Sequence, residues 1–253
     1  MAFVTDMLCI LGPTASGKTR LAVAIAHELG AEIISADSRQ VFRSMDIGTG
    51  KDLDEYCIDG KAIPHHLIDI VDPGVEYSVY DFQRGFLAAY KQLRNRGVFP
   101  VLCGGTGLYL DAVLQGYDLQ PVPRNEVLRS ELEKQSDQAL VERLATLCPL
   151  HNTTDVEDRQ RLIRAIEIAS CGNAKKKAFP PISSKVYGLK WQRAKLRARI
   201  TTRLLERLEN GLIEEVHGLL DGGLSPEQLS FYGLEYRFVT NYVCGRLNRN
   251  DMF

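Results

Sequence analysis

Paired cysteines are missing from this chain of 253 residues, although it contains six cysteines. None of the six stands in a Cys-x-x-Cys arrangement, and no His-x-x-x-His pair follows them. Zinc sites and disulfide frameworks both need such regular spacing. The sequence therefore favours isolated thiols in a reducing compartment over either kind of site.

Long apolar runs and an excess of one charge are missing as well. No stretch approaches the roughly 18 apolar residues of a membrane helix, and no basic region precedes the short apolar run Met7–Leu11 as it would in a signal peptide. We therefore expect a cytoplasmic protein with no membrane partner, or an organellar one without its transit peptide. Lysine and arginine number 31 against 32 acidic residues, so only local clusters of charge can indicate a partner.

Short apolar runs alternate with helical patterns over the first hundred residues. The runs, which we expect to be buried strands, are Met7–Leu11, 31–36 and 98–103. Residues 19–29 and 81–96 carry apolar residues at helical spacing, and each segment is followed by a glycine. This alternation predicts an α/β fold, a P-loop NTPase-like parallel sheet with helices on both faces.

The pattern changes about half-way along the chain. Charged helical segments follow, with prolines at their entry and a polar, proline-bearing linker at their end. We expect an all-helical insertion domain over 118–184, between core segments 1–117 and 185–253. Two further elements are expected in the second core segment: a strand at 186–189 and a long helix over 193–220, broken near Asn210 and Gly211.

A phosphate-binding pattern, Gly-x-x-x-x-Gly-Lys-[Ser/Thr], stands between the first expected strand and the first expected helix. Its glycines let backbone N–H groups turn toward an anion, and the helix N-terminus adds the positive end of its dipole. Lys18 can neutralise phosphate charge, and Thr19 can offer its hydroxyl to Mg²⁺. The residues of this loop are Gly12, Pro13, Thr14, Ala15, Ser16, Gly17, Lys18 and Thr19.

The strand that accompanies this loop in nucleotide-hydrolysing proteins, an apolar run ending in an aspartate for Mg²⁺, has no persuasive match. Residues 31–37 and 66–69 are candidates, and no kinase signature stands beside the loop. Asp37 ends an expected strand, where ligands of open α/β sheets bind, but it is equally suited to cap a following helix. A small-molecule kinase with an ATP site is therefore an alternative with little support.

A second glycine-rich loop, "GGTGLYL" at 104–110, follows the third expected strand. Two such loops at neighbouring strand ends indicate one crevice, in which backbone groups and a hydroxyl approach an anion. Arg199 and Arg203 stand one helical turn apart, as do Arg161 and Arg164. Each pair is either a solvated helix face or part of a surface that binds a polyanion.

The motifs occur in an order that resembles the tRNA dimethylallyltransferases, the isopentenyl transferases that modify the adenine just 3′ of the anticodon. In this chain they read "GPTASGKT", "DSRQVFRSMDIGTGK", "GGTGLYL", "RQRLIRAIEI", "RARITTRLLERLENGLIEEV" and "GLEYR". The resemblance extends over about residues 7–245. It implies that the loop grips the diphosphate of dimethylallyl diphosphate, together with Mg²⁺, rather than a nucleotide to be hydrolysed.

The reaction implied by the resemblance moves a five-carbon prenyl group to the exocyclic amine of adenine. This amine is a poor nucleophile, because its lone pair is delocalised into the ring, whereas the allylic carbon ionises readily once the diphosphate is stabilised as a leaving group. Catalysis then needs cations and N–H donors on the diphosphate and an acceptor for the proton of the amine. A flipped-out base from an anticodon loop suits such a pocket.

The resemblance also implies roles for single residues. Asp37 is the expected general base, Arg199 adds a charge to the diphosphate site, and Thr106 lies near the reacting centre and the target adenine. The expected partners are dimethylallyl diphosphate and the tRNA anticodon stem-loop, and we expect a monomer. The residues expected to contact tRNA are Asp37, Ser38, Arg39, Gln40, Thr106, Arg129, Gln160, Arg161, Leu162, Ile163 and Arg164.

Three departures from the family pattern have expected consequences. The family commonly has Gly-Thr-Ala-Lys-Pro at residues 48–52, and the loss of its proline here is expected to loosen that loop. The arginine of the family's Glu-Val-Arg-Ala-Arg stretch is displaced, and we expect Arg129 to substitute for it. Family members usually continue past the position of Phe253 into a helix that helps to hold tRNA. We therefore expect a lower affinity for tRNA, whereas we expect the prenyl site to be complete.

Two other functions stay open from the sequence. An adenylate prenyltransferase would use free AMP, ADP or ATP as the acceptor, and a non-catalytic RNA-binding module would bind tRNA without transfer. The helical insertion and the "QRLIR" stretch favour tRNA over a free nucleotide.

Overall fold

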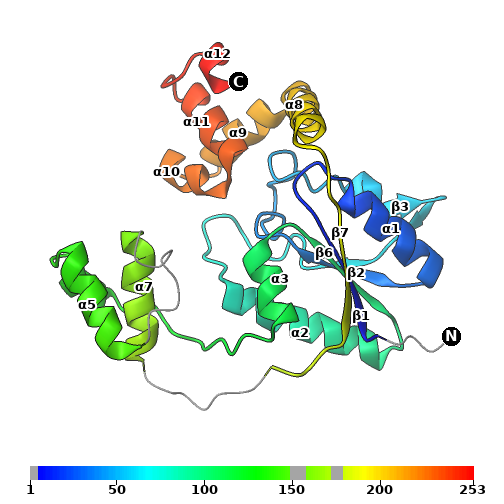
Figure 1. The fold of residues 1–253 in the computed structure, drawn as a ribbon. Helices are drawn as coiled ribbons and strands as arrows, with labels where there is room; N and C mark the ends of the chain where they lie inside the picture. Colours follow the sequence, from blue (N-terminus) through cyan, green and yellow to red (C-terminus); the bar gives the residue numbers. More distant parts are fainter. Residues whose placement is uncertain (1–4, 149–157, 172–178) are drawn as a thin grey trace. The chain divides into compact units, whose positions relative to one another are not determined.

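A computed structural model describes residues 5–148, 158–171 and 179–253 (Figure 1). The chain forms two compact units. The core unit comprises Met1–Tyr117 and Pro180–Phe253, and the helical unit comprises Asp118–Phe179. Part of the linker that we expected before residue 184 lies outside the described residues, and its last five residues belong to the core unit.

Five parallel strands form the sheet of the core unit, in the spatial order β5-β2-β6-β1-β7. The four strands expected from the sequence are confirmed to within two residues at each end, and the two-residue β5 was not predicted. The strands are β1 (Met7–Leu11), β2 (Glu32–Ala36), β5 (His65–His66), β6 (Pro100–Gly104) and β7 (Ser184–Gly188). A short antiparallel hairpin, β3 (Cys57–Ile58) with β4 (Lys61–Ala62), stands apart from this sheet.

Helices cover both faces of the sheet, as the continuous apolar strands predict. Successive side chains of a strand point to opposite faces: Leu8 and Ile10 pack in one core cluster with residues of α1, while Cys9 between them is also fully buried. Figure 1 shows α2 and α3 on the side of the sheet away from α1. The helices are α1 (Lys18–Leu29), α2 (Val79–Asn95) and α3 (Gly107–Leu114).

The second part of the core unit continues into helices. The break expected near residue 210 is confirmed, because Gly211 takes a left-handed backbone with φ 101° between α8 and α9. These helices are α8 (Arg193–Glu209), α9 (Leu212–Asp221), α10 (Pro226–Leu229), α11 (Leu234–Val243) and α12 (Arg249–Met252). Their apolar side chains share a core with Val41, Phe42 and Met45, so this bundle is packed on the segment that follows β2.

The described part of the helical unit contains α4 (Glu126–Leu132), α5 (Asp137–Leu147) and α7 (Arg159–Ser170). Its small core consists of Leu132, Leu140, Leu144, Leu162, Ile163 and Ile166. Among the described residues of both units, no helix combines the length and the hydropathy that crossing a bilayer requires.

A buried carboxylate joins two helices of the helical unit. Glu167 on α7 accepts hydrogen bonds from Arg129 Nε (2.8 Å) and Nη2 (2.7 Å) on α4, from Arg164 Nη1 (3.0 Å) and from the Asn125 amide (2.9 Å). Its side chain is 1% exposed. The bond from Arg129 is the main cause that lowers the pKa of Glu167 to about 2, ahead of the bonds from Asn125 and Arg164, while burial opposes the shift.

Glu167→Gln is expected to weaken the helical unit, because it leaves two guanidinium groups without their carboxylate. Removing one partner of a buried ion pair costs about 3–5 kcal/mol. We expect this cost to appear in hydrogen exchange, measured on the full chain at pH 6, as lost protection of the α7 amides. A lowered folded-state pKa gives stability that is complete above the ordinary value of 4.5 and is lost as pH falls toward about 2. The wild type should therefore lose protection in that pH window.

The exposed Glu131→Gln is the matched control and should keep the wild-type protection. Equal protection in Glu167→Gln and the wild type at pH 6 would show that the ion pairs contribute nothing to the unit.

Candidate active site

The phosphate-binding loop joins β1 to α1 at the carboxyl end of the sheet. Ala15 and Gly17 take left-handed backbone conformations, with φ 60° and 83°, which curl the loop around its N–H groups. The Ser16 hydroxyl is buried without a hydrogen-bond partner among the described residues, an arrangement that costs free energy unless an acceptor is supplied. In the described part of the chain, Lys18 Nζ makes only a long contact, 3.5 Å, to the Pro13 carbonyl. The loop is therefore built to receive an anion.

The segment around the start of α8 binds the outside of this loop. Trp191 Nε1 donates to the Ser16 carbonyl (3.0 Å), and Arg199 Nε donates to the Ala15 carbonyl (2.7 Å). The Arg199 guanidinium also lies 4.8 Å from the centroid of the Trp191 ring, a cation–π distance. Arg199 is thus beside the anion loop, as expected, and Trp191 helps to fix the loop.

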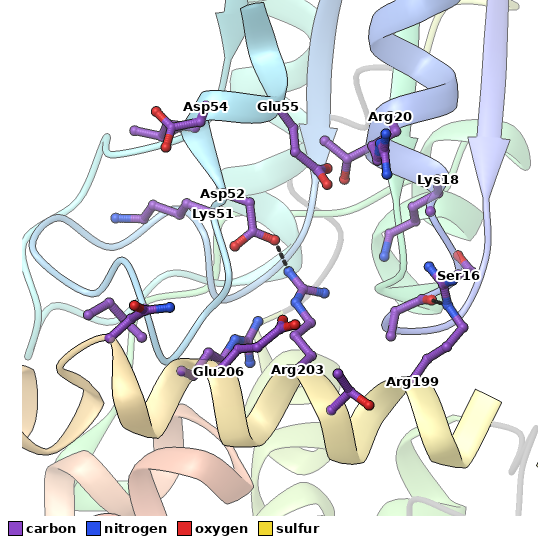
Figure 2. A pocket seen from close by; sticks show the side chains of 18 of the residues that line it. Ser16, Lys18, Arg20, Lys51, Asp52, Asp54, Glu55, Arg199, Arg203 and Glu206 are labelled. Atoms are coloured by element: carbon purple, nitrogen blue, oxygen red, sulfur yellow. Dashed lines mark hydrogen bonds and ion pairs between the residues drawn. The ribbon is translucent and has the colours of Figure 1, made fainter. Parts of the chain in front are cut away.

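A cleft of about 1040 Å³ opens between this loop, residues 46–55 and α8 (Figure 2). It is of the size that small-molecule sites reach. Arg199 and Arg203 both line it, so their expected common orientation is confirmed, and Thr19 lines it too. The charged lining residues are Lys18, Arg20, Asp46, Lys51, Asp52, Asp54, Glu55, Arg199, Arg203, Glu206 and Arg207.

Polar residues at the ends of β2 and β6 lie against one another. The Thr106 hydroxyl accepts from the Ser38 amide (3.0 Å) and lies 3.3 Å from the Ser38 hydroxyl. Asp37 Oδ1 accepts from the amides of Arg39 (2.8 Å) and Gln40 (3.3 Å). Asp37 therefore caps the turn that follows it, in line with the capping role considered from the sequence. It uses one oxygen for this, and Oδ2 has no hydrogen bond among the described residues.

Two glycines allow this close approach of strand ends and loops. A Cβ at Gly104 would lie 2.1 Å from the Ala36 carbonyl oxygen, so a side chain there would force β6 away from β2. A Cβ at Gly105 would lie 3.1 Å from the Gly12 carbonyl and 3.5 Å from Lys18 Nζ. The two glycine-rich loops therefore meet, as their positions at neighbouring strand ends predict.

Gln40, expected to contact tRNA, forms hydrogen bonds through both the oxygen and the nitrogen of its amide group. Its Nε2 donates to the Gly50 carbonyl (3.0 Å), and its Oε1 accepts from the Ser35 hydroxyl (3.3 Å). In the described structure it connects the turn after Asp37 with the loop at 48–52. A contact with a base need not break either bond, because the amide keeps a second N–H and a second lone pair.

A carboxylate binds the backbone at the start of the loop at 48–52, whose loosening by the missing proline stays a prediction. The Glu215 carboxylate of α9 accepts from three consecutive amides, Asp46 (2.8 Å), Ile47 (2.7 Å) and Gly48 (3.0 Å), and from the Tyr236 hydroxyl (2.6 Å). Hydrogen bonds to a charged acceptor are stronger than neutral ones. This carboxylate therefore restrains the backbone at residues 46–48.

A buried lysine restrains the same loop from its other end. Lys51, 1% exposed, donates to the Phe42 carbonyl (2.7 Å) and to Asp46 (2.6 Å), and it also pairs with Asp69. These bonds satisfy all three ammonium protons, which a buried lysine requires.

Gly50→Ala is expected to destabilise the protein. Gly50 has φ 62°, and a Cβ there would lie 1.7 Å from Arg207 Nη2 and 2.6 Å from Arg203 Nη2. A left-handed backbone costs an alanine about 1–2 kcal/mol, and the displaced guanidinium groups add to that cost. Thermal denaturation should give a lower Tm than for Gly60→Ala, which has φ 73° but nothing within 4 Å. Equal Tm values for the two variants would show that the contact of the added Cβ with the two guanidinium groups costs nothing.

The helical unit places the other residues expected to contact tRNA in different environments. Leu162 and Ile163 are fully buried in its core, so their side chains are not available to RNA. Arg129 and Arg164 are bound to Glu167, and a contact of Arg129 with tRNA stays a prediction. The members of this set with exposed side chains are Gln160 and Arg161.

Sequence reasoning missed several residues of the cleft, namely Arg20, Asp52, Glu55 and Glu206. The acidic run of residues 52–55 directly after the Gly-Lys pair was a usable signal. Glu206 follows Arg199 and Arg203 on one face of the same helix, so helical spacing could have found it.

Comparisons with known proteins agree with this geometry. Residues 40–253 match the IPP transferase family, and residues 5–60 match the isopentenyl transferase family. The chain belongs to the IPP transferase family. It is 58% identical to tRNA dimethylallyltransferase 2 of Syntrophotalea carbinolica, over 98% of this chain and 83% of that protein. It is 53% identical to tRNA dimethylallyltransferase 2 of Phocaeicola vulgatus, over 98% and 82%.

Solved structures of IPP transferases share the fold. The full-length tRNA isopentenylpyrophosphate transferase of Bacillus halodurans is 34% identical, with a TM-score of 0.69 over 98% of this chain and 80% of that one. The tRNA delta(2)-isopentenylpyrophosphate transferase of Staphylococcus epidermidis is 28% identical, with a TM-score of 0.65 over 97% and 83%. The family and the fold class expected from the sequence are thereby confirmed.

Proposed function

We propose that this IPP transferase moves a dimethylallyl group from dimethylallyl diphosphate to the exocyclic amine of the adenine 3′ of the anticodon in tRNA. The observation that carries the proposal is a chain of contacts along three strand ends: the anion-binding loop after β1 meets the loop after β6, and Thr106 of that second loop is bonded to Ser38, which directly follows the carboxylate of Asp37. Such a site joins leaving-group stabilisation to proton acceptance. The names of the relatives at 58% and 53% identity support the substrate.

The diphosphate is proposed to bind to the amides of the phosphate-binding loop, to the Ser16 hydroxyl, to Lys18 and to Arg199. When the allylic C–O bond breaks, its electron pair goes to the diphosphate oxygen, and these donors stabilise the charge that develops there. The positions of Lys18 and Arg199 around the loop support this role.

Magnesium fits the residues present. Mg²⁺ is usually held by few protein ligands together with water and phosphate oxygens, and Thr19, in the first turn of α1, lines the cleft. Among the described residues, no group of three or more metal-ligating side chains competes with this position. Bound there, the ion would neutralise part of the diphosphate charge.

The acceptor side is proposed to depend on Asp37 and Thr106. The amine nitrogen bonds to the allylic carbon, and its proton passes to Asp37 Oδ2, the oxygen that has no hydrogen bond among the described residues. The bonds from Arg39 and Gln40 to Oδ1 fix the orientation of the carboxylate. The Thr106 hydroxyl, held by Ser38, lies beside it and can orient the base.

Three features of this proposal concern the setting of the reaction. Gln160 and Arg161 are the proposed contacts of the helical unit with tRNA, because their side chains are exposed. The cytoplasm is the proposed location, since tRNA is the proposed acceptor. A monomer is the proposed active form, because the loop, Asp37 and Arg199 belong to one chain.

The test is transfer of label from dimethylallyl diphosphate, with Mg²⁺, to a tRNA that has an unmodified adenine 3′ of the anticodon. Label should enter this tRNA and not a variant with guanine at that position. Label in AMP rather than tRNA would identify an adenylate prenyltransferase, and transfer of a γ-phosphate from ATP would identify a kinase. Absence of label in any acceptor would contradict prenyl transfer.

A further inference from the structure

The cations of the cleft differ in their partners. Among the described residues, Lys18 and Arg199 form no ion pair with a carboxylate: Lys18 is near the Pro13 carbonyl, and Arg199 is bound to the Ala15 carbonyl. Arg203, one helical turn further along α8, does form such a pair, with Asp52. The first two cations are therefore ready for an anion, and the third is engaged.

The Asp52–Arg203 pair spans the cleft. Asp52 belongs to the wall formed by residues 46–55, whereas Arg203 extends from α8 on the opposite wall (Figure 2). The side chains are 41% and 27% exposed, so solvent and ligands reach both. An ion pair this exposed is worth about 1 kcal/mol or less. A phosphate group that carries more charge than a carboxylate can therefore displace Asp52 from Arg203.

Among the described residues, the carboxylate of Asp52 makes no hydrogen bond or ion pair other than the one with Arg203. Asp52 is the N-cap residue of the short helix η1 (Leu53–Tyr56), but its side chain makes no capping hydrogen bond. Its charge acts on the cleft instead: burial raises the pKa of Glu55, and the neighbouring Asp52 raises it further, whereas Arg203, Arg20 and Lys18 lower it. Asp52 thus places negative charge among the groups that face the phosphate-binding loop.

We propose that Asp52 is a counter-charge that holds Arg203 across the cleft and releases it to the diphosphate of the prenyl donor. Arg203 then becomes the third cation on the diphosphate, after Lys18 and Arg199. Because an existing ion pair must break for each donor that binds, Asp52 lowers the affinity for the donor and for the diphosphate product. The proposal rests on the proposed function, since it takes the diphosphate to lie on the phosphate-binding loop.

Removal of the negative charge of Asp52 is expected to tighten the binding of diphosphate. For Asp52→Asn, calorimetry should show that inorganic pyrophosphate binds about two- to fivefold more tightly, the range that an exposed ion pair allows. The KM for dimethylallyl diphosphate should fall by a similar factor, and the KM for tRNA should not change. Arg203→Met should weaken pyrophosphate binding about tenfold. In the Arg203→Met background, Asp52→Asn should have no further effect.

A matched control separates this pair from the general charge of the cleft. Glu206 also lines the cleft on α8, and it forms no ion pair among the described residues. Glu206→Gln should give a smaller gain in pyrophosphate affinity than Asp52→Asn. An equal gain would overturn the proposal, because it would show a field effect without exchange of partners.

Two other results would also overturn it. Weaker pyrophosphate binding in Asp52→Asn would mean that Asp52 orients Arg203 toward the ligand, and unchanged binding in Arg203→Met would mean that Arg203 is not recruited. Lys18→Met distinguishes these results from a failure of the proposed function. If Lys18→Met weakens binding and Arg203→Met does not, only the exchange is wrong; if neither weakens it, the diphosphate does not lie on the loop.

Discussion

Replacing Asp37 with asparagine is expected to lower kcat for prenyl transfer by about 10²–10⁴-fold, the usual contribution of a general base. Asparagine keeps the oxygen that accepts from the amides of Arg39 and Gln40, so the turn after β2 should persist. It cannot take the proton of the amine. Single-turnover transfer from labelled dimethylallyl diphosphate to tRNA measures the loss, and filter binding should show nearly unchanged affinity for tRNA.

Asp37→Ala separates the two uses of this side chain. It removes the proton acceptor and the cap together, so its free energy of unfolding should be lower than that of Asp37→Asn by the ~1 kcal/mol typical of a lost cap, and its Tm should be lower as well. Its transfer rate should be as low as that of the asparagine variant. Transfer at the wild-type rate in Asp37→Asn would exclude a role for the carboxylate in proton acceptance.

Replacing Lys18 with methionine is expected to lower kcat/KM for the prenyl donor by about 10²–10³-fold, as the loss of a donor to a developing anion does. Methionine keeps most of the length of the side chain, and the one hydrogen bond that Lys18 makes to a described residue is a 3.5 Å contact with the Pro13 carbonyl. The fold should therefore be unaffected, with an unchanged Tm. Steady-state kinetics at varied donor concentration measure the effect.

Arg20→Met is the control for Lys18, because Arg20 lines the same cleft and is exposed. Its kcat/KM should fall by less than about threefold, in line with the small energies of exposed charges. A loss as large as that of Lys18→Met would mean that the net charge of the cleft, and not the phosphate-binding loop, carries the effect.

Local patterns in the sequence predicted most of the core unit. Buried parallel strands are continuous apolar runs, and Gly30 and Gly211 mark helix limits through backbone conformations that other residues rarely adopt. The start of α2 was misplaced by two residues, because Ser78 and Asp81 form a capping box that the periodicity of apolar residues does not reveal. Strand β5 was missed since two residues leave no period to detect.

The candidate site was predictable only where its residues are close in sequence. The phosphate-binding loop is one contiguous pattern, and Asp37 directly follows a strand. The contacts of Glu215 with residues 46–48, and of Arg203 with Asp52, join segments more than 150 residues apart. No local spacing encodes such a pair. Burial of Leu162 and Ile163 was readable from helical spacing but was outweighed by the family pattern.

The bonds of the Glu215 carboxylate to three consecutive backbone amides bear on how ordered the cleft is before a substrate binds. Residues 46–48 form a small anion-binding nest of the same physical kind as the phosphate-binding loop across the cleft. One nest is filled by the protein's own side chain as soon as the chain folds, and the other is left to an anion from outside. One wall of the cleft is therefore preorganised at folding, and its backbone at residues 46–48 does not have to be ordered when the donor binds.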